Sequence, residues 1–213
     1  MNMDIHYIWI GDNKVPDNYF NNLDQCVKLN PTYNFVVWDD TKSLELLHQY
    51  NLTEYWNNLP TFISKCCMLR YIILDTYGGI YTDFDILWHK PFDNLLSKFY
   101  TGTDLLLTYN NFSSMVVNNK RVHVLDDPFI FSKPGILLDC VEYCQDRTEL
   151  INDGDLYMKT GELKTHKLEP VGPFGLTEWL YKFNIKFDCF PQVGNIDQYK
   201  GEFGFHDQKT NWR

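Results

Sequence analysis

The chain has 213 residues, a formal net charge of -9 at pH 7, and 44% hydrophobic and 16% aromatic residues. This composition is sufficient for a packed core and argues against wholesale disorder. The acidic balance argues against a general nucleic-acid binder, which needs a basic face. No window approaches 18 uninterrupted apolar residues and no signal-peptide pattern is evident, so we expect no transmembrane segment. The length suits one domain over residues 1–213, and the end just past Trp212 leaves open a longer parent chain.

The cysteines do not follow a metal-binding or disulfide pattern. Paired spacings of the zinc-site type are missing, so we expect reduced core thiols in an intracellular protein, in the host cytoplasm if the protein is viral. The six residues are Cys26, Cys66, Cys67, Cys140, Cys144 and Cys189.

The first half of the chain alternates predicted strands with predicted helices. Runs of β-branched and aromatic residues bounded by turn residues indicate the strands, and apolar residues at helical spacing indicate the helices. Successive β-then-α passages predict an α/β fold, with a mostly parallel central sheet flanked by helices. The expected elements are strands over 4–10, 34–38 and 80–83 and helices over 18–29, 43–50 and from Thr61 or Ser64 to Tyr77.

The second half gives weaker signals. Its polar, turn-rich residues 110–119 suggest a loop near the site, and residues 146–167 have no clear pattern. The expected elements are strands over 104–109, 128–132 and 185–190 and helices over 135–145 and 176–183.

One stretch organises the chain, from Arg70 through Gly78-Gly79 to Asp83-Phe84-Asp85. On an extended backbone, residues two apart point to the same face, so the two carboxylates are expected to converge while Phe84 turns into apolar surroundings. Two adjacent carboxylates favour a hard divalent cation. Mg2+ and Mn2+ complete such a shell with water and substrate phosphates. The stretch therefore predicts a metal-and-diphosphate site.

Five pieces of the sequence form a recognisable combination: His6 to Gly11, Leu69-Arg70, Tyr77 to Asp85, Val171 to Pro173 and His206 to Trp212. Together they resemble the family 32 glycosyltransferases with a DXD motif, and more distantly the large clostridial glucosylating toxins. The compact length is also similar to the N-terminal domain of a chlorovirus capsid glycosyltransferase. The resemblance implies a GT-A fold and sugar transfer from a UDP-sugar to a hydroxyl of a glycan or glycoprotein acceptor, with Mn2+ or Mg2+ and predominantly with retention.

The resemblance also implies roles for individual residues. Trp9 would stack on the uracil, and Arg70 would reach the donor sugar or its phosphates. Asp83 would contact ribose or sugar hydroxyls and the metal through water, Asp85 would ligate the metal directly, and His206 would be a further metal ligand. The alternatives are a core tryptophan, a structural ion pair, a solvated acidic turn and a structural histidine. Thr210, Asn211 and Trp212 would lie on the diphosphate.

Two positions depart from the family pattern. Asn211 stands where the family commonly has serine, which puts the individual contacts there in doubt. Cys67 stands three residues before the arginine, where the family usually has an aspartate that binds donor sugar hydroxyls. A thiol is a poor acceptor for a hydroxyl. We therefore hypothesise a donor other than plain glucose or mannose, such as a deoxysugar.

The mechanism and the activity class leave alternatives. A double displacement would need a carboxylate below the anomeric carbon, for which Asp126, Asp127 and Glu178 are the candidates, while a front-face mechanism needs none. A metal-dependent nucleotide-diphosphate-sugar hydrolase would use the same carboxylate pair. A non-catalytic carbohydrate-binding protein would use the aromatic residues without it.

Overall fold

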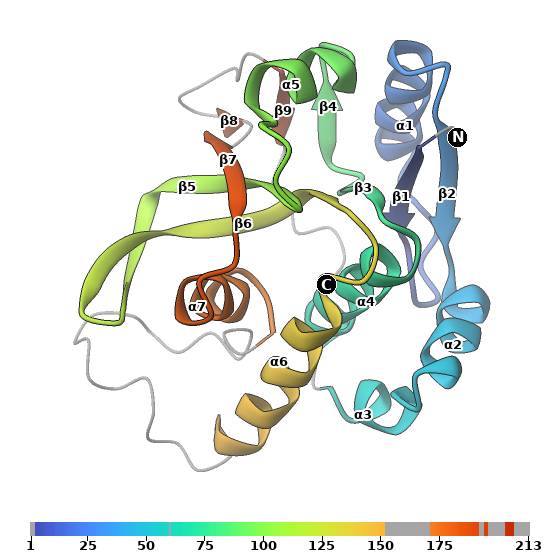
Figure 1. The fold of residues 1–213 in the computed structure, drawn as a ribbon. Coiled ribbons are helices and arrows are strands. Elements are labelled where there is room, and N and C mark those ends of the chain that lie inside the picture. Colours follow the sequence, from blue (N-terminus) through green and yellow to red (C-terminus); the bar gives the residue numbers. More distant parts are fainter. Residues whose placement is uncertain (1–2, 60, 152–170, 192–193, 196–202, 207–213) are drawn as a thin grey trace.

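The computed structural model describes residues 3–59, 61–151, 171–191, 194–195 and 203–206, except for the side chains of 110–113, 126–127, 147–151, 194–195 and 206. A six-stranded sheet in the order β2-β1-β3-β6-β5-β7 forms the centre (Figure 1). Its strands are β1 (Asp4–Ile8), β2 (Asn34–Trp38), β3 (Gly79–Thr82), β5 (Leu105–Val117), β6 (Lys120–Ser132) and β7 (Phe187–Pro191).

The strand directions make this sheet mixed. β1 is parallel to both β2 and β3, and β5 is parallel to β7, whereas β6 runs antiparallel to β3 and β5. The predicted α/β class and the parallel N-terminal half are therefore confirmed. A smaller sheet has the order β4-β9-β8, with β4 (Ile86–Trp88), β8 (Gly194–Asn195) and β9 (Gly204–His206).

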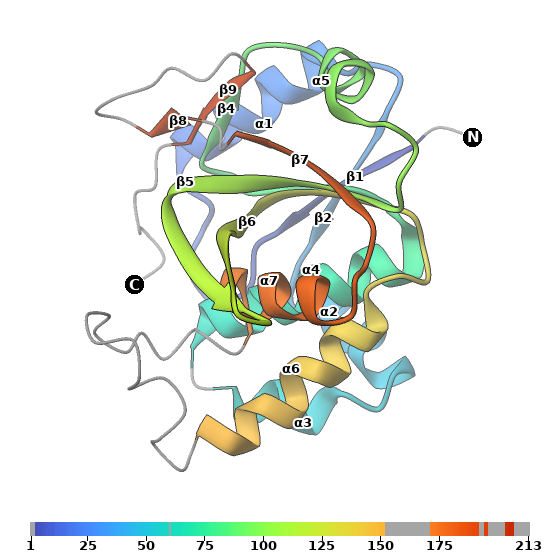
Figure 2. The same ribbon diagram turned by 60° about the vertical axis from the view of Figure 1, so that its left-hand side comes forward.

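Helices cover both faces of the central sheet (Figure 2). On one face α1 (Asp17–Leu29) and α5 (Phe92–Phe99) enclose an aromatic-rich core that includes Tyr7, Tyr19 and Phe92. The other face carries the larger core, built around α4. The helices on that side are α2 (Asp40–Gln49), α3 (Thr53–Asn58), α4 (Phe62–Tyr77), α6 (Leu138–Ile151) and α7 (Pro173–Lys182). In the part of the chain that the structure describes, no helix combines the length and apolar character needed to cross a bilayer.

The long helix and its glycine break form as the sequence predicts. Thr61 caps α4 by accepting a hydrogen bond from the Ser64 backbone N–H at 3.1 Å. Gly78 and Gly79 end it with φ of 65° and 91°, which L side chains rarely adopt. A Cβ on Gly79 would also lie 2.4 Å from the Asp4 carbonyl oxygen of β1. Glycine is therefore required where the chain leaves α4 and enters the sheet.

The largest difference from the sequence prediction concerns residues 110–119, where the expected loop is wrong. They belong mainly to the outer part of a β5–β6 hairpin, in which Val117 pairs with Lys120. Asn118 and Asn119 form its two-residue turn with φ of 51° and 62°, a conformation that asparagine tolerates. The asparagines and serines of this stretch conceal its strand character, because only part of it packs against apolar neighbours. Helices α3 and α5 and strand β4 were also not predicted.

A buried histidine joins β1, β2 and the end of α4. His6 is 1% exposed, its Nδ1 accepts a hydrogen bond from Trp38 Nε1 at 3.2 Å, and its Nε2 lies 3.0 Å from the Gly78 carbonyl oxygen. This arrangement requires a neutral ring with the proton on Nε2. Burial lowers the pKa of His6 from 6.5, while the Gly78 contact and Asp4 act in the opposite direction. The neutral imidazole is thus part of the fold.

We predict that Gly79→Ala lowers stability well beyond Gly102→Ala. Both glycines have strongly positive φ, 91° and 100°, so both variants bear backbone strain of about 1–3 kcal/mol. Only Gly79 faces a steric clash, because a Cβ at Gly102 would meet nothing within 4 Å. Urea unfolding of the two variants measures the difference, and equal losses would contradict the steric argument.

We also predict that part of the stability of the fold depends on the neutral state of His6. Because the folded-state pKa lies below 6.5, this contribution is complete above pH 6.5 and is lost as the pH falls through that value towards the folded-state pKa. Urea unfolding between pH 7.5 and about pH 5 should show a shallower pH dependence for His6→Gln than for the wild type. His48→Gln, at an exposed position of α2, is the control. An unchanged slope in His6→Gln would refute the assignment.

Candidate functional site

Several of the predicted site residues that the structure describes lie at one edge of the sheet. Because β1, β2 and β3 are parallel, their carboxyl ends meet there, where ligands of α/β proteins commonly bind. Trp9 follows β1, Asp39 and Asp40 follow β2, and Asp83 follows β3. Asp40 Oδ2 accepts a hydrogen bond from the Gly11 backbone N–H at 2.8 Å, which ties the first two loops together.

The centre of the site is a buried guanidinium. Arg70 is 6% exposed on α4, and its Nη2 lies 3.6 Å from Oδ1 of Asp83. The guanidinium carbon lies 4.5 Å from the centroid of the Tyr81 ring, and the Tyr81 hydroxyl donates to Asp83 Oδ1 at 2.5 Å. A buried cation is therefore balanced by a carboxylate and an aromatic face. The fold brings Arg70 and Asp83 together across thirteen residues of sequence.

Tyr81 is a site residue that the sequence reasoning missed. Burial raises the pKa of its phenol well above 10, the Arg70 charge opposes this, and the Asp83 charge adds to it. The phenol consequently stays protonated and donates to the carboxylate. The signal was present in the sequence, because Tyr81 stands two residues before Asp83 and so shares its side of β3.

The two aspartates lie on a turn rather than on an extended strand. β3 ends at Thr82, Phe84 and Asp85 form a turn, and the Ile86 backbone N–H donates to the Asp83 carbonyl oxygen at 3.4 Å. The expectation of an extended backbone through Asp85 is therefore wrong, because the chain must reverse to enter β4. Phe84 is buried as expected, 4.8 Å from the Tyr7 ring between centroids.

Trp9 lies half-buried on the opposite face of the sheet from Arg70. Its ring packs edge-on against Tyr19 and Phe84, with centroid distances of 6.0 and 5.8 Å, and its Nε1 donates to the Asn13 carbonyl oxygen at 2.6 Å. These contacts fix the ring on the loop after β1 and leave part of it accessible. Stacking on uracil stays a prediction.

Cys67 belongs to the larger hydrophobic core. It is 3% exposed and is grouped with residues of α2, α4 and α6, whereas its neighbour Cys66 is only half-buried. An aspartate at position 67 would require a polar partner within this core. The thiol therefore contributes to packing here, and its effect on donor choice stays a prediction.

The structure describes the remaining candidate site residues only in part. The backbone of His206 pairs with that of Ile86, the residue that follows Asp85. The side chain of His206 is not among those that the structure describes. Asn211 and Trp212, with Thr210, lie outside the described residues. Glu178 is half-buried on α7. The side chains of Asp126 and Asp127 are not described, although the Asp83 N–H donates to the nearby Pro128 carbonyl oxygen at 3.0 Å.

The carboxylates at the turn fit a hard divalent cation in their chemistry. Asp83 Oδ1 is occupied by Tyr81 and lies near Arg70, which suits Asp83 to a water-mediated or hydroxyl contact and leaves direct ligation to Asp85. Among the described side chains, no group of three His, Cys, Asp or Glu residues could hold a metal. The predicted metal ligands are Asp83, Asp85 and His206. The His206 side chain is not among the described ones, so this absence does not apply to the complete predicted set.

We predict that Tyr81→Phe destabilises the protein more than Tyr100→Phe. The Tyr81 hydroxyl donates to a carboxylate, whereas the Tyr100 hydroxyl donates to the neutral Thr103 carbonyl oxygen at 2.7 Å. Hydrogen bonds to charged groups contribute about 1.5–3 kcal/mol and neutral ones about 0.5–1.5 kcal/mol. Urea unfolding of both variants tests this, and a larger loss in Tyr100→Phe would contradict the proposed charge balance.

Comparison with known proteins gives both sequence relatives and structural neighbours. Inositol phosphoceramide mannosyltransferase 1 of Schizosaccharomyces pombe is 35% identical over 99 residues, which are 44% of this chain and 31% of that protein. Uncharacterized glycosyltransferase L373 of Acanthamoeba polyphaga mimivirus is 28% identical over 133 residues, which are 60% of this chain and 53% of that protein. The matches thus span about a third to a half of these curated relatives.

Among solved structures, the PaToxG glycosyltransferase aligns with a TM-score of 0.56 and 16% identity, covering 85% of this chain and 69% of that one. The ligand-free glycosyltransferase domain from the YGT toxin aligns with a TM-score of 0.50 and 11% identity, covering 90% and 80%. These likenesses concern the fold alone and confirm the GT-A expectation.

The family described as glycosyltransferase sugar-binding region containing DXD motif matches residues 16–101. This segment includes Arg70, Asp83 and Asp85 and confirms the resemblance found in the sequence. Over residues 16–101 this chain is thus similar to the DXD-containing glycosyltransferase sugar-binding family.

Proposed function

We propose that this protein is a metal-dependent glycosyltransferase that moves a sugar from a UDP-sugar to a hydroxyl of a glycan or glycoprotein acceptor, with retention. The observation that carries the proposal is the Arg70–Tyr81–Asp83 contact beside the Asp83–Ile86 turn. It lies within the segment matched by a sugar-binding family and at the carboxyl edge of the sheet. Cationic and acidic groups fixed at such an edge suit a charged, hydroxyl-rich donor.

The proposed roles combine the geometry of the described residues with the family resemblance. Arg70 would hold the donor sugar or its phosphates, because burial and its contacts with Tyr81 and Asp83 restrict the guanidinium to this position. Asp83 would orient ribose or sugar hydroxyls. Trp9 would stack on the uracil base, and Asn211 and Trp212 would contact the diphosphate. Preorganised charges of this kind stabilise a leaving group without reorganisation during the reaction.

Asp85, His206 and, through water, Asp83 would hold Mn2+ or Mg2+. A divalent cation bound there would neutralise the leaving diphosphate. The chain's own contribution is to fix the carboxylates on a tight turn, with Asp83 beside the buried Arg70 guanidinium. Retention would need either a carboxylate such as Asp126, Asp127 or Glu178, or a front-face route without a nucleophile.

The names of the relatives widen the choice of donor and acceptor. Several curated relatives are named as mannosyltransferases, and the Schizosaccharomyces pombe protein is named for an inositol phosphoceramide acceptor. Mannose donors and glycolipid acceptors therefore belong in any substrate panel. The Cys67 hypothesis predicts that a deoxysugar donor is preferred over the corresponding hexose.

Two rival functions give different observations. A nucleotide-diphosphate-sugar hydrolase would release the nucleotide at a rate that no acceptor changes. A non-catalytic carbohydrate-binding protein would bind glycans equally well after EDTA treatment and would ignore nucleotides. The buried Arg70 guanidinium favours a phosphorylated ligand over a neutral glycan, which argues against the carbohydrate-binding alternative; the acceptor dependence of nucleotide release separates the transferase from the hydrolase.

We predict that Asp85→Asn abolishes Mn2+-dependent turnover while the protein stays folded. Loss of one carboxylate weakens cation binding, whereas the amide keeps the shape of the side chain. Asp17→Asn, on the exposed first turn of α1, is the matched control and should retain wild-type turnover. Release of nucleotide from donor sugars measures the activity. Unchanged Mn2+-dependent turnover in Asp85→Asn would refute the metal assignment.

The donor can be found by thermal shift with Mn2+ and a panel of UDP- and GDP-sugars. Ligand stabilisation grows with occupancy, so the true donor class should raise the melting temperature most. We expect UDP-sugars to give the largest increase and EDTA to remove it. Stabilisation by GDP-sugars alone would replace the uridine assignment, and no stabilisation by any nucleotide would contradict the proposed function.

A further inference from the structure

The tip of the β5–β6 hairpin extends beyond the edge of the sheet that carries the site. Thr82, the last residue of β3, pairs with Phe129, and β6 runs antiparallel to β3. Residues 120–128 therefore continue past the carboxyl end of β3. Nine residue steps separate Lys120 from Phe129, so the tip lies at most about 30 Å from the end of β3 along the strand. Figure 1 shows this hairpin projecting from the body of the fold.

The hairpin is held in place by α7. The Leu125 backbone N–H donates to Thr177 Oγ1 at 2.8 Å, and Asn118 Nδ2 donates to the Tyr181 carbonyl oxygen at 3.4 Å. Val117 and Val124 are buried, being 6% and 3% exposed. One side of the hairpin is thus packed, and the Asn118 contact joins its tip to the carboxyl-terminal end of α7.

Large apolar groups are also exposed at this end of the molecule. Val116 is 57% exposed and Phe183, which follows α7, is 53% exposed; these are the highest values among the large hydrophobic residues described. Val116 pairs across the hairpin with Arg121, so the two side chains lie on the same face. Exposed apolar groups of this kind commonly mark an interaction surface.

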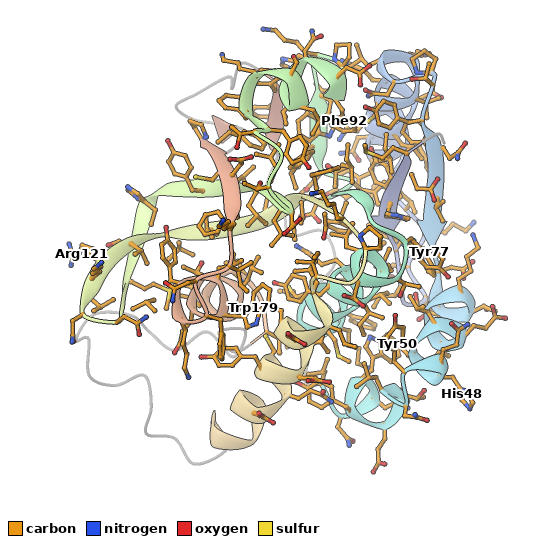
Figure 3. All side chains as sticks on the ribbon, in the orientation of Figure 1. His48, Tyr50, Tyr77, Phe92, Arg121 and Trp179 are labelled. Atoms are coloured by element: carbon orange, nitrogen blue, oxygen red, sulfur yellow. The ribbon has the colours of Figure 1, made fainter. Side chains whose placement is uncertain are left out.

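The same end of the molecule is basic although the chain is acidic. Lys120, Arg121 and Lys182 are exposed, and Figure 3 shows Arg121 at the outer end of the hairpin. Neither residues 114–123 nor residues 179–184 contain Asp or Glu, in a chain of net charge -9. Glu178, half-buried one turn before Lys182, is the nearest acidic residue in the sequence.

We propose that this end of the molecule docks the protein on an anionic lipid surface. It presents Val116 and Arg121 on the open face of the hairpin, Lys120 beside the hairpin turn, and Lys182 and Phe183 at the end of α7. Lys and Arg attract acidic headgroups, while exposed Val and Phe side chains enter the boundary between headgroups and acyl chains. A nucleic acid would use the cations but leave Val116 and Phe183 in water. Docking would hold the carboxyl edge of the sheet within reach of a membrane-borne acceptor.

Vesicle co-sedimentation tests this directly. We expect the wild type to bind phosphatidylcholine vesicles that contain phosphatidylinositol, and not vesicles of phosphatidylcholine alone, with binding that weakens as salt is added. Each cation near an anionic surface strengthens binding by roughly fivefold, so Lys120→Glu/Arg121→Glu should weaken it by at least about twenty-fivefold. Val116→Ser should weaken it by a smaller factor.

The control is Lys28→Glu/Lys42→Glu, which makes the same change in net charge at exposed positions of α1 and α2 and should bind as the wild type does. Absence of wild-type binding to anionic vesicles, or equal binding by the hairpin variant, would overturn the proposal. Binding to heparin without binding to vesicles would also overturn it, in favour of a soluble polyanion. Stabilisation by nucleotides with Mn2+ should be unchanged in the hairpin variant, which separates this test from that of the proposed function.

Discussion

The site depends on the burial of one guanidinium. Arg70 sits almost completely inside the protein, so its charge must be compensated by groups that the fold places beside it. Tyr81 supplies an aromatic face and Asp83 a carboxylate, and the Tyr81 hydroxyl links the two. This contact joins α4 to the end of β3. It orients the first aspartate of the motif, and it gives the carboxyl edge of the sheet a fixed positive charge next to a fixed negative one.

Two tight turns position the elements that form this contact. Gly78 and Gly79 let α4 return directly into β3, with Gly79 so close to Asp4 that a larger residue would collide with β1. Four residues later the chain turns again at Asp83–Ile86 and starts β4, which pairs with β9. The second turn brings the backbone of His206 opposite Ile86. The carboxyl-terminal part of the chain thereby returns to the motif from which the site is built.

Much of this could be predicted from the sequence because the signals were local. The strand over 34–38, the Thr61 cap and the glycine break rely on short-range rules, and the family resemblance located Arg70 and Asp83. The hairpin could not be found in this way, because Asn118 and Asn119 read as loop residues until Val117 and Val124 are seen packed in the fold. The turn at Asp83 was missed for a similar reason. Period-two alternation assumes an extended backbone, and nothing between Asp83 and Asp85 indicates that the chain reverses.

The most direct test of the account is a crystal structure of the protein with Mn2+ and UDP, with the metal located by its anomalous scattering. We predict an anomalous peak within about 2 Å of a carboxylate oxygen of Asp85, with the diphosphate on the same side as Arg70. Uracil should lie against Trp9. A manganese ion and nucleotide bound away from the Asp83–Ile86 turn would contradict the account, even if the protein proved to be an active glycosyltransferase.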